Sequence, residues 1–321
     1  MIEHVDLKDF IQHVPLLTPI AAKESVILGV NYSIEGLVDH LITVGDTTKF
    51  NENTLVLSKK LSEKEADKII SRWVEAIELH NTRDVILIID RYMDFLEQIM
   101  NAFKNCSINP NTLFLLPGPD SDLETLYKST ESFINIFTIS KTLMPIDLNL
   151  LNTLSSNILD FGKKIYPETI LKKIIPLFSA EKNKITNAKI IAISYLCNVS
   201  VELFNTPENL FKFFKYTSLV NFNPEYVVLS SIFSPKKVWD GNELEKAMLK
   251  ILKPVYLNSL KFSVFNDENL NNEIILMNTV SKISSNYCYL IKGYKKYSNL
   301  TNSKSQETVI TQNIIEGCKD D

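Results

Sequence analysis

The chain has 321 residues, which is long enough for two domains and an extensive hydrophobic core. Hydrophobic residues make up 45% and charged residues 22% of the chain, a composition that excludes an intrinsically disordered protein. The net charge of −4 excludes a general attraction of the whole surface to nucleic acid. Neither a secretory signal nor an apolar stretch of the roughly 18 residues needed to span a membrane is visible, so we expect a cytoplasmic or nuclear protein.

Strand and helix patterns alternate along residues 1–143, an order typical of a doubly wound, mostly parallel sheet. Ser62 and Glu65 have the spacing of a capping box and predict the start of a helix, and Ser121 and Glu124 repeat that spacing. The expected strands are 24–30, 54–57, 83–90, 112–116 and 134–139, and the expected helices are 34–42, 62–79, 92–106 and 121–132. We therefore expect a Rossmann-like or degenerate P-loop-like α/β domain at 1–143.

The stretch 83–90 is expected to form the central strand of this domain. Five apolar residues, 85–89, run without alternation and end at the carboxylate of Asp90. Such a run is typical of a strand that helices cover on both faces. Ligands of open α/β sheets usually lie at the carboxyl ends of the strands, so the residues that follow the strands are the first candidates for a site.

Four residues at these positions are candidate ligand contacts. Asn31 follows the first strand, Asp90 ends the central strand, and Asp120 and Ser121 lie in the turn after the strand at 112–116. Asp90 stands where a metal-binding Walker-type carboxylate would, and the alternative is that it caps the next helix or pairs with a neighbouring base. The alternative for Asp120 and Ser121 is a turn that only stops a strand and caps a helix.

The loop after the first strand lacks the chemistry of known phosphate-binding loops. Six residues separate Gly29 from Gly36, and Leu37 and Val38 follow where a P-loop carries Lys and Ser or Thr. The dinucleotide pattern G-x-G-x-x-G and the nucleophile pattern G-x-S-x-G are also missing from the sequence. His40 and His80 have no second His or Cys at ligand spacing. We therefore predict no catalytic residue, no cofactor and no metal.

Beyond residue 143 the patterns become mostly helical, and we expect an all-α domain at 144–297. The expected helices are 147–164, 168–178, 186–205, 207–217, 225–233, 241–263 and 268–292. Residues 298–321 are polar and predict a disordered tail, in which 309–315 would be able to dock on a partner. The four cysteines, at 106, 197, 288 and 318, are widely spaced and form no metal-type pair, so we expect free thiols.

The two halves of the chain carry opposite charge. Residues 1–145 hold 13 Lys and Arg against 21 Asp and Glu, whereas 146–321 hold 21 Lys against 17 acidic residues. The basic half predicts a face for nucleic acid or an acidic partner, and the alternative is an ordinary solvated helix surface. The residues assigned to this face are Lys163, Lys164, Lys172, Lys173, Lys236 and Lys237.

A nucleotide-type domain without a phosphate loop, followed by a helical domain, resembles the arrangement of non-catalytic clamp-loader subunits. The leading hypothesis is a non-enzymatic subunit or adapter of an intracellular complex. In it the degenerate domain is a scaffold and the helical domain binds other protein subunits. One alternative is a transferase that holds a nucleotide-linked donor at the strand carboxyl ends. The other is a clamp-loader-like adapter in nucleic-acid metabolism that binds nucleic acid through the basic half.

Overall fold

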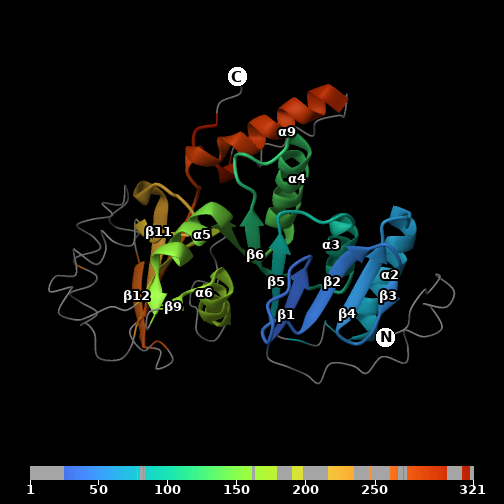
Figure 1. Cartoon of the computed structure of the whole chain (residues 1–321), viewed down its shortest axis with the longest axis horizontal. Helices are drawn as coiled ribbons and strands as arrows, with labels where there is room; N and C mark the ends of the chain where they lie inside the picture. The colour runs from blue at the N-terminus through green and yellow to red at the C-terminus, as the bar shows by residue number, and fades with distance from the viewer. Residues whose placement is uncertain are drawn as a thin grey trace.

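Over the residues that it describes, the computed structural model places eleven strands in one sheet, with helices packed on both faces (Figure 1). The order of strands across the sheet is β12-β11-β13-β10-β7-β6-β5-β1-β2-β4-β3. The structure describes residues 25–77, 79, 82, 84–160, 163–178, 190–197, 216–234, 246, 261–266, 270, 273–301 and 313–318.

The bounds of the elements are as follows. The strands of the sheet are β1 (Ser25–Val30), β2 (His40–Gly45), β3 (Lys49–Phe50), β4 (Thr54–Ser58), β5 (Asp84–Asp90), β6 (Asn111–Leu116), β7 (Thr142–Asp147), β10 (Ile190–Leu196), β11 (Val227–Ser234), β12 (Lys261–Asn266) and β13 (Ile274–Val280). A separate hairpin consists of β8 (Leu159–Asp160) and β9 (Lys163–Lys164). The α-helices are α2 (Glu63–Ala76), α3 (Leu96–Asn105), α4 (Leu123–Ile139), α5 (Leu148–Asn157), α6 (Pro167–Ile174) and α9 (Cys288–Thr301). Short 3₁₀ turns are η3 (Ile175–Phe178), η4 (Pro224–Tyr226) and η5 (Ser285–Tyr287).

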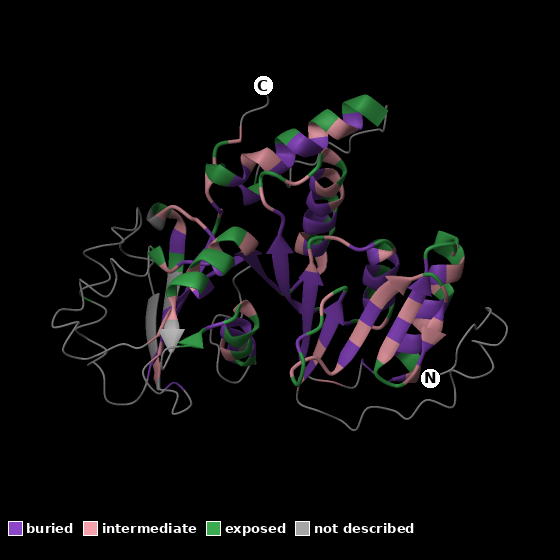
Figure 2. Ribbon diagram, viewed as in Figure 1, coloured by how far each residue is buried: buried purple, intermediate pink, exposed green. Residues whose placement is uncertain are grey.

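β5 is the central strand that its apolar run predicts. Every residue from Asp84 to Ile89 is buried, and the neighbouring strand β6 is buried along its whole length (Figure 2). Successive strand residues face opposite sides. Leu87 and Ile89 pack in a cluster with α2, α3, α4 and α9, whereas Ile86 and Ile88 pack in a second cluster with α5 and α6. The sheet is therefore the middle of three layers, and its mostly parallel α/β character is confirmed.

Two predictions in the first half are wrong in detail. Residues 34–42, expected as a helix, form a turn followed by β2. The left-handed backbone at Asn31 (φ 53°) and Gly36 (φ 73°) turns the chain, so that no helix starts there. Residues 134–139 continue α4, and the expected strand comes later as β7. The capping box of Ser62 and Glu65 is confirmed at the start of α2.

The all-α character expected at 144–297 is wrong. Four strands, β10 to β13, extend the same sheet, with β10 parallel to β7 and β13 antiparallel to β10. β10 and β13 are nearly continuous apolar runs, and both are buried along almost their whole length. A short run of this kind fits a buried helix and a buried strand equally well, which explains the error. The boundary proposed between 143 and 144 falls inside β7.

The C-terminal residues differ from two further expectations. Ile314 and Ile315, within the segment expected to be disordered, are 1% and 2% exposed. Ile315 pairs with Ile283 in a parallel bridge. Cys288 and Cys318, expected as free thiols, form a disulfide. Tertiary packing and the cross-link thus hold a segment that its polar surroundings did not mark as structured.

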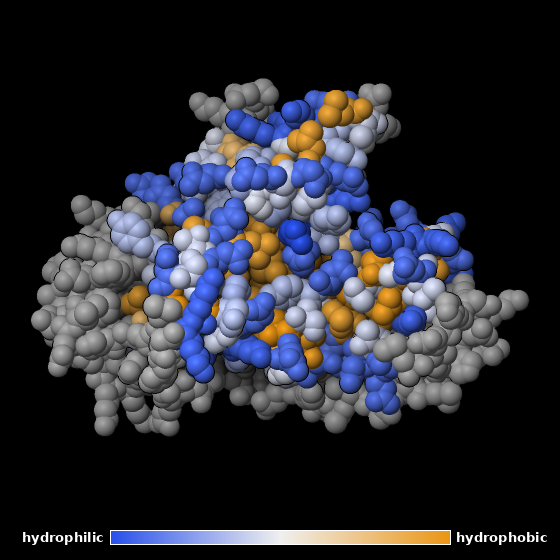
Figure 3. Space-filling view, viewed as in Figure 1, coloured by the Kyte–Doolittle hydropathy of each residue, from blue (hydrophilic) through white to orange (hydrophobic). Residues whose placement is uncertain are grey.

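The surface is mixed in character. In the space-filling view, hydrophobic atoms show through the middle of the face, and hydrophilic side chains surround them (Figure 3). Within the part of the chain that the structure describes, four large apolar side chains are exposed at scattered positions: Tyr166, Tyr216, Val228 and Leu300. Among the described residues, no helix has the length and apolar character that crossing a membrane requires.

Candidate ligand site at the carboxyl edge of the sheet

The parallel strands β4, β2, β1, β5, β6 and β7 end along one edge of the sheet. Val30 pairs with Ile89, so Asn31 and Asp90 follow at neighbouring strand ends, as the sequence predicts. Asn31 Oδ1 accepts a hydrogen bond of 2.9 Å from Thr43 Oγ1, and its N–H donates to Ile42 O at 2.9 Å. Asn31 therefore fastens the end of β1 to β2.

Asp90 is paired with the residue that follows it. Arg91 Nε and Nη2 donate to Asp90 Oδ1 and Oδ2, each at 3.0 Å, in a bidentate pair. The hydrogen bonds to Asp90 raise the pKa of Arg91. Burial first, then the charges of Glu168 and Asp90, raise the pKa of Tyr32 to about 12. Asp90 thus lies near Tyr32 and is neutralised by Arg91, which matches the neighbouring-base alternative.

Asp120 and Ser121 lie in the turn after β6, as expected, but they do not cap the next helix. Asp120 is exposed, and the N–H of Ser121 donates to Gly118 O at 3.2 Å. The N-cap of α4 is Asp122, whose Oδ1 accepts from Thr125 N at 2.8 Å. The second capping box predicted at Ser121 is therefore wrong by one residue. Asp122 is the residue with extended backbone directly before α4, and its carboxylate caps the helix.

A cavity of about 550 Å³ opens beside this edge, between the loops that follow β4 and β5, the start of α3 and the middle of α4. Its lining includes Lys59, Tyr92, Phe95, Glu97, Lys128 and Glu131. This volume is within the range of small-molecule sites, roughly 300–1,000 Å³. The sequence did not single out any of these six residues, because they lie in three separate segments that only the fold brings together.

The start of α3 faces this cavity. Phe95 takes the N-cap position in left-handed conformation, with φ 67°, and none of the described side chains makes a capping hydrogen bond there. The amino end of a helix carries partial positive charge and favours anions. The first turn of α3 therefore favours a negatively charged group, and Glu97 of the same turn already supplies one.

Lys128 brings a positive charge to the same cavity. Its Nζ is 2.8 Å from Glu124 Oε1 and 3.7 Å from Asp94 Oδ1, and it lies 5.3 Å from the centre of the Tyr92 ring. The hydrogen bond with Glu124 is the main cause that raises the pKa of Lys128. Burial, with a smaller contribution from Glu97, raises the pKa of Glu131. The cavity thus combines a fixed ammonium group with carboxylates.

The six lysines assigned to a basic face have different environments. Lys163, Lys164 and Lys172 are exposed, whereas Lys173 Nζ is 3.0 Å from Glu273 Oε2. Glu273 Oε1 also accepts from Tyr195 OH at 2.7 Å, so Lys173 belongs to a network that ties α6 to the sheet. Lys236 and Lys237 lie outside the described residues. Among the described residues, no group of three or more His, Cys, Asp and Glu side chains could hold a metal ion.

Comparison with known proteins identifies the fold. No family model and no curated protein sequence matches the chain. It is similar to CetZ1 from Haloferax volcanii, solved as a GDP-bound monomer, with TM-score 0.58, 10% identity, and coverage of 87% of this chain and 100% of that chain. CetZ2 from the same organism, solved as a GTPγS-bound protofilament, gives a TM-score of 0.61 with 9% identity, and the match covers 87% of this chain and 100% of that chain. An empty FtsZ dimer from M. jannaschii gives a TM-score of 0.51 with 11% identity, and the match covers 85% of this chain and 91% of that chain.

The chain therefore has the fold of CetZ and FtsZ over most of its length. This finding overturns the hypothesis of a degenerate scaffold or adapter, because two of the similar proteins are solved with a guanine nucleotide. The clamp-loader resemblance fails as well, because it requires a helical second domain where the sheet continues. Neither a nucleotide-linked transferase, nor a nucleic-acid partner, nor a nuclear location finds support in these comparisons.

Proposed function

We propose that this chain is a cytoplasmic protein that binds a guanine nucleotide at the carboxyl edge of its sheet and associates with copies of itself into protofilaments. The similarity to CetZ along the whole of the CetZ chains carries the proposal, since one of those proteins is solved with GDP and the other as a GTPγS-bound protofilament. The general placement of ligands at strand carboxyl ends supports the position.

We infer that the nucleotide phosphates lie in the cavity beside β4 and β5, whose lining combines Lys59 and Lys128 with carboxylates. The first turn of α3 would direct backbone N–H groups and its partial positive charge at the phosphates, and Lys59 and Lys128 would add full charges. This arrangement would take the place of the glycine-rich loop that the sequence lacks. The lining of the cavity does not include Asn31, Asp90, Asp120 or Ser121, so the proposed phosphate site does not use them.

Binding is tested by thermal unfolding with GDP, GTPγS, ADP and no nucleotide. A guanine nucleotide at about 100 times its Kd is expected to stabilise the chain by about 2.7 kcal/mol. Lys128→Ala is expected to weaken the affinity roughly tenfold or more, since it removes a charged hydrogen-bond donor. Lys172→Ala, which removes an exposed lysine outside the cavity, is the matched control and should bind like the wild type.

Self-association is tested by sedimentation of the same samples. The proposal expects GTPγS to shift the chain into pelletable polymers and the nucleotide-free protein to stay in the supernatant. The absence of both a thermal shift and a pellet at millimolar guanine nucleotide would overturn the proposed function.

A further inference from the structure

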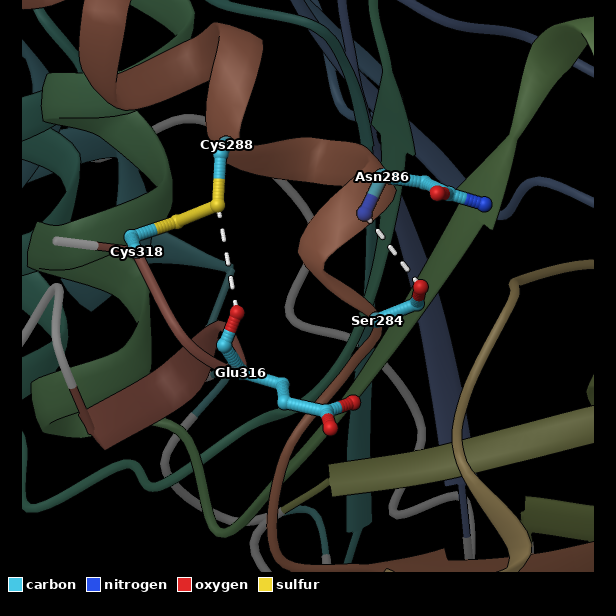
Figure 4. Close-up of a disulfide and its surroundings, with 5 residues drawn as sticks. All are labelled: Ser284, Asn286, Cys288, Glu316 and Cys318. Carbon is cyan, nitrogen blue, oxygen red and sulfur yellow. Dashed lines mark hydrogen bonds between the residues drawn. A yellow bond between two sulfur atoms is a disulfide. The ribbon is translucent and has the colours of Figure 1, made fainter.

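A disulfide joins the start of α9 to the C-terminal segment 313–318. The Cα atoms of Cys288 and Cys318 are 5.6 Å apart, and 30 positions separate them in the sequence (Figure 4). Both residues are partly exposed, and both also pack against the main core cluster. Cys288 Sγ also lies 3.9 Å from Glu316 O, within the same segment.

Apart from the disulfide, a short set of contacts holds the segment 313–318. Ile283 N donates to Ile314 O at 2.9 Å, and Glu316 N donates to Ile283 O at 2.8 Å. Ile314 and Ile315 are buried against the main core cluster. Asn223 Nδ2 makes a longer contact of 3.4 Å with Glu316 Oε1. The segment is thus attached through one short stretch of backbone pairing and two buried side chains. We therefore expect its attachment to weaken when the cross-link is lost.

α9 is held by contacts of its own. Thr130 Oγ1 on α4 donates to Leu290 O at 3.0 Å, and the rings of Tyr127 and Tyr294 stack at 4.7 Å. Tyr289 OH donates to Pro117 O at 2.6 Å. In Figure 1 α9 lies across the end of α4, in agreement with these contacts. Breaking the disulfide would therefore leave α9 in place and affect only the segment 313–318.

We propose that Cys288–Cys318 is a reversible thiol–disulfide exchange site, which a dithiol reductant opens to release the segment 313–318 from Ile283. One thiolate of the dithiol attacks Cys318 Sγ, the protein S–S bond breaks, and Cys288 leaves as a thiolate that takes up a proton. The second thiol of the reductant, losing its proton, attacks the sulfur bound to Cys318 and frees that residue as a thiol. Two electrons and two protons pass to the protein, and the reductant ends as a cyclic disulfide.

The position of Cys288 supports this direction of attack. Cys288 begins α9 directly after η5, whose N-cap is Ser284, so it lies within about one turn of the positive end of this helical stretch. That end stabilises a thiolate and so makes Cys288 the better leaving group. Disulfides in reducing compartments are mostly transient or redox-sensing, so a cytoplasmic location would favour a switch over a permanent cross-link. The exchange itself does not depend on nucleotide binding, and its test is independent of the proposed function.

Release would uncover a defined surface. The N–H and C=O of Ile283 would lose their partners on Ile314 and Glu316, and the apolar side chains of Ile314 and Ile315 would leave the core. The reduced form would thus present one backbone pairing position beside an apolar strip, a surface that is closed in the oxidised form.

Amide hydrogen exchange of the full chain, before and after dithiothreitol, tests the proposal. Reduction is expected to accelerate exchange at the amides of Ile283 and Glu316 about 100-fold. Without the cross-link the opened segment has more conformational freedom, so opening costs less free energy. Amides in the middle of α9 are the internal reference and should keep their protection. A Cys288→Ser, Cys318→Ser double variant should match the reduced wild type, and Cys106→Ser is the matched control.

Two results would overturn the proposal. One is a bond that stays intact in millimolar dithiothreitol under native conditions, as measured by alkylation and mass. The other is complete reduction with unchanged protection at Ile283 and Glu316, which would show that the other contacts suffice to hold the segment. Loss of protection along α9 as well would contradict the independent anchoring of that helix.

Discussion

Tyr287 donates a hydrogen bond of 2.8 Å to Asp147 Oδ2, and so joins η5 to the end of β7 across 140 positions of the sequence. The same hydroxyl accepts from Asn221 N at 3.0 Å. Asp147 Oδ1 accepts from Asn149 N at 2.9 Å, at the start of α5. Burial, and then the charge of Asp147, raise the pKa of Tyr287, so the phenol stays protonated. The C-terminal part of the chain is thereby fixed at the carboxyl edge of the sheet.

Tyr287→Phe is expected to lower the free energy of unfolding by about 1–3 kcal/mol, because Asn221 N and Asp147 lose a partner at a side chain that is 1% exposed. Urea denaturation measures the loss. Tyr166→Phe removes a hydroxyl at a side chain that is 66% exposed, and should change stability little. An equal loss in the two variants would mean that the Tyr287 network contributes nothing specific.

Gly293→Val is expected to cost about 2 kcal/mol, because a Cβ at this position would lie 2.8 Å from Leu126 Cβ and Cδ1. The clash falls in the contact between α9 and α4. Lys292→Val places the same side chain on the exposed face of the same helix, and so separates helix propensity from packing. Chemical denaturation of the two variants gives the comparison, and equal stabilities would contradict the close approach of the helices.

Asp122→Ala is expected to destabilise the chain at neutral pH, whereas Ser121→Ala is not, because Asp122 is the N-cap of α4. Hydrogen bonds from Thr125 lower the pKa of Asp122 below its usual 3.8. A lowered folded pKa means that the stabilisation is present above the unfolded pKa and is lost as the pH falls through the folded value. The difference between wild type and Asp122→Ala should therefore shrink below about pH 3.8. A pH-independent difference would contradict an ionised cap.

Two local signals predicted their elements correctly, whereas the helix pattern at 34–42 and the capping box at Ser121 did not. The uninterrupted run of β5 and the capping box of Ser62 and Glu65 carry their signals within a few residues. β10 and β13 were missed because a short, mostly apolar run has the same appearance in a buried helix and a buried strand. Only their pairing with β7 and with each other decides between the two.

The candidate site was predicted in part for a similar reason. Asn31 and Asp90 follow strands, and parallel pairing brings strand ends together, so their proximity followed from the order of the elements. Lys59, Tyr92 and Lys128 line the cavity from three segments whose spacing in the sequence carries no motif. The left-handed conformation of Phe95, which shapes the start of α3, has no local signal because a large aromatic residue rarely adopts it.

We expect the cavity at the start of α3 to hold a guanine nucleotide, and amide hydrogen exchange of the full chain with and without GTPγS measures this binding. GTPγS should protect residues 59–63 and 92–98 and the face of α4 near Lys128, with a smaller effect in Lys128→Ala. Saturating nucleotide that protects neither loop, or that protects only segments away from the carboxyl edge, would contradict it.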